Sequence, residues 1–172
     1  VTDRFHVQKL AFEALQEMRV KARWEALDKE SIQIAYAKAC GKIYHAPTFE
    51  NGDSRKQLLA RSIYLLYKKE SLWTESQRIR AGILFREYPD LKKAYYLSMR
   101  LGLIYHQCKH KDTALTRLAR WYDEVEKSGF LAFGRVIRSI QTHYLEIVNF
   151  FDRRSTNAAS ESFNAKIKDF RT

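Results

Sequence analysis

A row of polar side chains near the C-terminus has the spacing of one helix face. The row lies in RRSTNAASESFNAKIKDFRT, residues 153–172, and comprises Asn157, Glu161, Asn164 and Lys168, at steps of four, three and four. At about 100° per residue, a second and apolar face comprises Ala159, Phe163, Ile167 and Phe170. We expect the apolar face to pack inward. The spacing leaves two interpretations of Glu161 open: a solvated carboxylate with weak i,i+3 or i,i+4 contacts, or a member of an active site.

A second polar pair opens the chain. The stretch VTDRFHV runs from apolar to acidic, as the end of a strand does, and continues with Asp3, His6 and the start of a helix. The candidate chemistry is therefore carried by the two ends of the sequence, and the segments between them must position it.

Hydrophobic periodicity predicts that these intervening segments are helical. Apolar residues recur at steps of three and four over residues 7–18, which predicts a first helix. The stretch HAPTFENGDS, residues 45–54, combines Pro, Asn, Gly and Asp and is predicted to be the longest loop. Thr74 and Gln77 have the capping-box spacing, so a helix should start near residue 75. Between them, a second helix is marked by Leu59, Ile63 and Leu66.

The second half of the chain continues the helical pattern. Pro89 suits the first turn of a helix, whose apolar stripe comprises Leu91, Ala94, Tyr95, Ser98, Leu101 and Tyr105. Asp112 is the predicted N-cap of the next helix, and Gly129 its stop. The buried face of that helix comprises Leu115, Leu118, Tyr122 and Val125. One long helix is predicted over residues 133–151. Because strand signals are nearly absent, the predicted fold class is all-α, a multi-helix bundle.

The composition describes a basic, globular chain. Gly (6) and Pro (2) are scarce among 172 residues, which disfavours an all-β fold because such folds need many turns. Lys and Arg number 31 against 20 Asp and Glu, and the net charge of +11 favours a polyanionic partner, nucleic acid first and an acidic protein second. Two cysteines are too few for a disulfide framework and suit a reducing cytoplasm. No apolar run reaches the roughly 18 residues of a membrane span.

Several motifs, taken in order, resemble one enzyme family. They comprise Asp3, Arg4, Phe5, His6 and Val7 at the start, Leu118 and Trp121 in the middle, and Thr156, Asn157, Glu161, Asn164, Ile167 and Lys168 in the tail. This pattern closely resembles the C-terminal part of bacterial insertion-sequence transposases of the ISL-three family, and the resemblance covers nearly the whole chain. Ala158 and Ser162 stand where that family commonly has glycine, which suggests a divergent subgroup.

The resemblance implies a DDE-type transposase with an RNase H-like core interrupted by a helical insertion. In such enzymes three acidic residues hold two Mg²⁺ (or Mn²⁺) ions, which activate water or a DNA 3′-hydroxyl for attack on a phosphodiester. Glu161 aligns with the last acidic residue, and Asn157, Asn164 and Lys168 would position it or contact phosphate. Asp3 is either the second catalytic aspartate or, with His6, a supporting pair beside the site. On either interpretation, at least one catalytic aspartate is expected before Val1.

The same resemblance implies a division of the chain and a set of partners. Residues 1–30 would hold the strand end and the helix after the Asp-x-x-His motif, residues 31–152 the helical insertion, and residues 153–172 the helix with the glutamate. The expected partner is DNA, with a homo-oligomer as a further expectation and no membrane, in the bacterial cytoplasm near the nucleoid. The expected DNA contacts are Arg153, Arg154, Lys166 and Lys168.

Because the chain begins at Val1 without a methionine, we expect it to be a piece of a longer transposase. One or two carboxylates cannot organise two metal ions, so the piece should be inactive and free of bound metal by itself. The alternative is a non-enzymatic basic helical module that binds nucleic acid or an acidic partner.

Three further groups of residues invite a functional interpretation that the sequence does not favour. HQCKH places His106, Cys108 and His110 at steps of two, which suit neither face of a helix, and no second pair stands at a zinc-finger spacing. Trp24, Trp73 and Trp121 are predicted to be core residues, since they stand at helical spacing beside Leu and Ile. Paired cations such as Lys68 and Lys69 are generic phosphate contacts that read no sequence.

Overall fold

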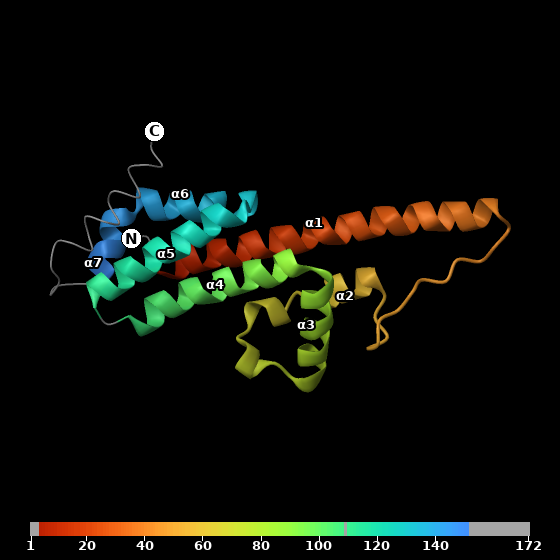
Figure 1. Cartoon of the computed structure of the whole chain (residues 1–172), viewed down its shortest axis with the longest axis horizontal. Helices are drawn as coiled ribbons and strands as arrows, with labels where there is room; N and C mark the ends of the chain where they lie inside the picture. The colour runs from red at the N-terminus through yellow and green to blue at the C-terminus, as the bar shows by residue number, and fades with distance from the viewer. Residues whose placement is uncertain (1–3, 109, 152–172) are drawn as a thin grey trace. The chain divides into compact units, whose positions relative to one another are not determined.

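A computed structural model describes residues 4–108 and 110–151 of the chain (Figure 1). Within them lie the α-helices α1 (Arg4–Ala39), α2 (Arg55–Arg61), α3 (Glu75–Glu87), α4 (Pro89–Gln107), α5 (Lys111–Ser128), α6 (Gly134–Thr142) and α7 (Tyr144–Phe150). Three 3-10 helices lie between them, η1 (Leu65–Tyr67), η2 (Glu70–Leu72) and η3 (Leu131–Phe133). The described residues form no strand, and their one bridge pairs Thr48 with Ser54. The predicted all-α class is therefore confirmed.

The chain divides into two compact units. The first contains the described residues up to Ala14 and from Tyr95 onward, and the second is Leu15–Ala94. Helices α1 and α4 each contribute residues to both units. The expected division at residues 30 and 152 stays a prediction.

The first unit is a bundle whose core follows the predicted stripes. Val7, Ala11 and Ala14 of α1 are fully buried, and the α4 stripe from Tyr95 onward and the predicted face of α5 are buried as well. Polar groups join the helices within this core. Ser98 Oγ donates to the backbone oxygen of Ala11 at 3.1 Å. This buried hydroxyl thus has a partner, which keeps the cost of burying it low.

Trp121 ties α5 to α4 in the same core. Its side chain has no exposed surface, and its indole Nε1 donates to the backbone oxygen of Leu97 at 2.8 Å. Its ring also lies 6.5 Å from that of Phe133. The prediction of a core tryptophan is confirmed at this position.

Two predictions for helix boundaries in this unit need correction. The N-cap of α5 is His110, so Asp112 lies inside the first turn, where its charge still favours the positive end of the helix dipole. The long helix over residues 133–151 is divided at His143 into α6 and α7, because Thr142, His143 and Tyr144 are three successive residues of low helix propensity. The predicted stop at Gly129 is confirmed, since its φ of 67° is the left-handed conformation that glycine adopts without strain.

In the second unit, α2 packs against the middle of α1 and against α3. The capping box is confirmed: the Gln77 backbone N–H donates to Thr74 Oγ1 at 3.3 Å, and Gln77 Oε1 accepts from the Thr74 backbone N–H at 3.1 Å. The helix expected through Leu66 is shorter than predicted, because α2 ends at Arg61 and η1 follows. The predicted loop is confirmed as part of residues 40–54, the long connection between α1 and α2.

Buried polar groups join α1 to α2 within this unit. Arg19 of α1 donates through Nη1 to the backbone oxygen of Leu59 at 2.8 Å, near the C-terminus of α2, where a cation complements the helix dipole. Burial and the neighbouring charge of Arg23 lower the pKa of Arg19. Trp24, on the same helix, is 59% exposed, so the prediction that it belongs to the core is wrong. Trp73 is half-buried and donates to the backbone oxygen of Leu65 at 2.8 Å.

Candidate nucleic-acid interface

Most of the residues predicted to form the metal site or to contact DNA lie outside the described part of the chain. They comprise Asp3, Arg153, Arg154, Asn157, Glu161, Asn164, Lys166 and Lys168. His6 is described, and it lies exposed in the first turn of α1. Their proximity to one another stays a prediction.

The described residues do not themselves offer a metal site. Across residues 4–108 and 110–151, no three His, Cys, Asp or Glu side chains are grouped closely enough to hold an ion. His106, Cys108 and His110 are among these residues, and the interpretation that they are not ligands stays a prediction. The predicted ligands Asp3 and Glu161 lie outside the described residues, so their place in a magnesium site stays a prediction.

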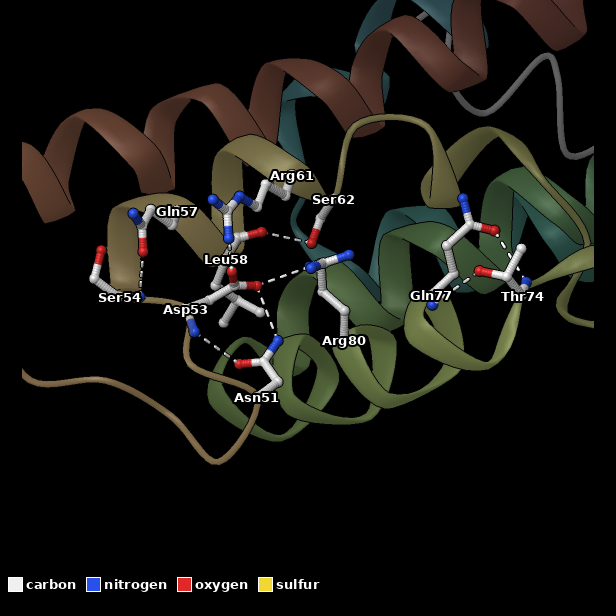
Figure 2. Close-up of polar contacts among 10 residues, drawn as sticks. All are labelled: Asn51, Asp53, Ser54, Gln57, Leu58, Arg61, Ser62, Thr74, Gln77 and Arg80. Atoms are coloured by element: carbon white, nitrogen blue, oxygen red, sulfur yellow. Dashed lines mark hydrogen bonds and ion pairs between the residues drawn. The ribbon is translucent and has the colours of Figure 1, made fainter.

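The most buried carboxylate of the described chain, Asp53, is held by arginines (Figure 2). Its side chain is 1% exposed. Arg80 of α3 donates through Nε to Asp53 Oδ2 at 2.8 Å, and Arg61 of α2 donates to Asp53 Oδ1. Asn51 Nδ2 donates to Oδ2 at 2.9 Å, and Asn51 Oδ1 accepts from the Asp53 backbone N–H at 3.1 Å. One carboxylate therefore joins the loop, α2 and α3.

The electrostatics of this cluster identify it as structural. Burial by itself would raise the pKa of Asp53, but hydrogen bonds from Arg80, Arg61 and Asn51 outweigh it and lower the pKa. Three of the roughly four lone-pair sites of this carboxylate thus accept hydrogen bonds from Arg61, Arg80 and Asn51. It holds the loop in one conformation.

A basic stripe on α5 is the strongest candidate interface in the first unit. Arg117, Arg120 and Lys127 are exposed on the face opposite the buried side of the helix. Glu124 lies between them and is bound by Arg100 of α4, so its charge is already neutralised. No ion pair neutralises Arg117, Arg120 or Lys127 within the described part of the chain. At 1.5 Å per residue, Arg117 and Lys127 lie about 15 Å apart along the axis, enough to contact separate backbone phosphates of one DNA.

This basic stripe was not predicted from the sequence, although the spacing of its residues indicates it. Steps of three, four and three connect Arg117, Arg120, Glu124 and Lys127, at roughly 180° from the apolar face. What the sequence does not contain is the pairing of Glu124 with Arg100, which leaves the stripe with a net positive charge.

Comparison with known proteins settles the family. A family model described as a transposase, that of the ISL-three DDE type, matches residues 1–172. The chain belongs to the ISL-three family of transposases. The expectation drawn from the motifs is therefore confirmed over the whole sequence, and the family implies DNA as the partner. No curated protein and no solved structure shows significant similarity to the chain.

Membrane insertion has no support from the helices. Among the described residues, no helix combines the length and the apolar character needed to span a bilayer.

Proposed function

We propose that this chain is the glutamate-bearing part of a transposase that cuts and joins DNA at the ends of an insertion sequence, with Mg²⁺ or Mn²⁺ as cofactor. The observation that carries the proposal is the match of the transposase family to all of residues 1–172. The basic character of the chain, with a net charge of +11, supports a role on a polyanion.

The metal would be held by carboxylates at the two ends of the sequence. Glu161 supplies one, and Asp3 either supplies a second or, with His6, supports the site from beside it. When bound, the metal supplies an activated water or 3′-hydroxyl for attack on the phosphodiester. Asn157, Asn164 and Lys168 share the helical face of Glu161 by their spacing, and we assign them to holding its carboxylate in position or to contacting phosphate.

The helical body would bind the DNA backbone. The basic stripe on α5 and the tail residues Arg153, Arg154 and Lys166 would contact phosphates, adding affinity without reading sequence. The stripe supports this role because its three cations are exposed on one face of a rigid helix.

The decisive experiment is Glu161→Gln in the full-length transposase, with Glu25→Gln as the matched control. Glu25 is exposed on α1, so its substitution removes the same charge at a site that we assign no role. Cleavage and joining of a labelled insertion-sequence end should be abolished by Glu161→Gln and unchanged by Glu25→Gln. Titration with Mn²⁺, followed by its electron paramagnetic resonance signal, should show weaker metal binding for Glu161→Gln alone.

The contrary result is equally clear. If Glu161→Gln joins strands and binds Mn²⁺ as the unchanged protein does, Glu161 is a surface carboxylate. The chain would then be a basic helical binding module.

A further inference from the structure

The second unit contains a groove that neither the metal site nor the basic stripe uses. It lies between α1 and the segment from residue 44 to residue 56 and has a volume of about 280 Å³. Its lining residues include Lys29, Gln33, Tyr44, Phe49, Ser54 and Arg55. The groove thus combines aromatic rings, an amide and cations within one unit of the fold.

The aromatic walls are held in fixed positions. Tyr44 Oη donates to Gln33 Oε1 at 3.0 Å, which anchors the ring to α1. The Arg55 guanidinium lies over the Phe49 ring, with Cζ 5.3 Å from the ring centroid. The Phe49 backbone N–H donates to the backbone oxygen of Asp53 at 2.9 Å, so the residue that the arginines hold also fixes this wall. Walls that are already ordered lose little entropy when a flat ligand stacks on them.

The charges around the groove leave an excess positive charge at Lys29. Lys56 Nζ lies 2.7 Å from Glu30 Oε2, and Arg55 Nη2 lies 2.9 Å from Glu87 Oε2, so these two pairs are neutral. Lys29 is exposed and has no ion-pair partner in the described part of the chain. An anionic group that enters the groove therefore meets an unpaired ammonium.

The aromatic surface continues past the groove along α1. Tyr36 stands three residues after Gln33, so it lies on the same side of the helix, and its side chain is 73% exposed. A chain of stacked bases that leaves the groove in this direction would meet a second ring. Sequence-tolerant binding of single strands depends on successive aromatic platforms beside cations.

We propose that this groove binds an unpaired nucleotide of DNA, with its base against Tyr44 and Phe49 and its phosphate at Lys29. The proposal rests on the proposed function, since it takes DNA as the partner, and it adds a site for single strands. A base within a duplex is stacked on both sides, and only an unpaired or extruded base offers its faces to protein rings.

The test is the affinity of the 172-residue chain for a labelled 12-nucleotide single strand and for the matching duplex, measured by fluorescence anisotropy. Tyr44→Ala should weaken single-strand binding by about 5- to 150-fold, the range of one lost stacking contact, and leave duplex binding unchanged. Tyr44→Phe keeps the ring but loses the hydrogen bond to Gln33, so it should weaken single-strand binding much less than Tyr44→Ala. Lys29→Ala should reduce the salt slope of single-strand binding by about 0.7, as the loss of one phosphate contact does.

Lys21→Ala is the matched control for Lys29→Ala, because Lys21 is exposed on the same helix and does not line the groove. It should leave single-strand affinity unchanged. A strand that carries one 5-iodo-deoxyuridine should also crosslink on irradiation to the peptide that contains Tyr44 and Phe49. Far-ultraviolet circular dichroism of each variant checks that it is folded.

Three outcomes would overturn the groove site. The first is no single-strand binding by the unchanged chain. The second is equal weakening of single-strand and duplex binding by Tyr44→Ala, and the third is an effect of Lys21→Ala as large as that of Lys29→Ala. The function proposed above is tested separately: if Glu161→Gln abolishes strand transfer while the groove variants bind single strands normally, the transposase mechanism stands and the groove site fails.

Discussion

Replacing Asp53 with asparagine should destabilise the second unit more than any surface substitution. The carboxylate is 1% exposed and accepts hydrogen bonds from Arg61, Arg80 and Asn51. Asp53→Asn keeps the shape of the side chain but leaves two guanidinium groups without a counter-charge. Breaking a buried pair on one side costs about 3–5 kcal/mol. Because Arg61 is 55% exposed and Arg80 17%, water compensates part of this loss, and we expect about 3 kcal/mol.

The measurement is urea unfolding of both proteins between pH 3 and pH 8. The folded pKa of Asp53 lies below its ordinary value, so the folded state releases the proton more readily than the unfolded state. The carboxylate then contributes stability above the unfolded pKa of about 3.9, and this contribution is lost as the pH falls through the folded pKa. The difference in unfolding free energy should therefore be constant from about pH 5 to pH 8 and shrink below about pH 4.

Glu50→Gln is the control, because Glu50 and its partner Arg86 form an ion pair in which both side chains are more than half exposed. Its urea midpoint should stay within error of the unchanged protein. The reasoning would be refuted by a loss below about 0.5 kcal/mol for Asp53→Asn at pH 7, or by a loss that persists undiminished at pH 3.

Three further predictions concern the first unit. Gly129→Ala should lower the free energy of unfolding by about 1 kcal/mol in urea, because φ is 67° there, whereas the helical Gly134→Ala should not destabilise it. Trp121→Phe should cost about 1–3 kcal/mol in the same assay, since the backbone oxygen of Leu97 loses its buried donor; an unchanged midpoint would contradict this. Arg120→Ala should reduce the slope of log affinity against log salt by about 0.9 for duplex DNA, and an unchanged slope would remove Arg120 from the interface.

Several features of the fold could be predicted from the sequence because they depend on neighbours within a few residues. The capping box at Thr74 and Gln77, the first-turn proline at Pro89 and the glycine stop at Gly129 are all local, and each lies where the sequence places it. The apolar stripes identify buried faces for the same reason, since helical periodicity is a property of one segment. Family membership also followed from sequence, through motifs at both ends of the chain.

The candidate site likewise combines features that local spacing indicates with one that depends on tertiary structure. The spacing of Asn157, Glu161, Asn164 and Lys168 identifies a metal-site face that stays a prediction, and the basic stripe on α5 is visible in the sequence once its period is sought. The pairing of Glu124 with Arg100, which gives the stripe its net charge, joins two helices and has no local signal.

Tertiary structure alone decided the features that join distant segments. Trp24 is a large apolar residue at helical spacing beside other apolar residues, which predicts a core position, yet no element of its unit covers it. The local sequence identifies Asp53 only as a loop residue. In the folded structure its side chain is buried and pairs with Arg61 and Arg80, which belong to two different helices. The groove likewise requires Lys29 and Tyr44, which belong to different segments of the chain, to line one cavity. Periodicity determines which face of a helix is apolar, but which partner covers that face depends on long-range packing energies that no single segment contains.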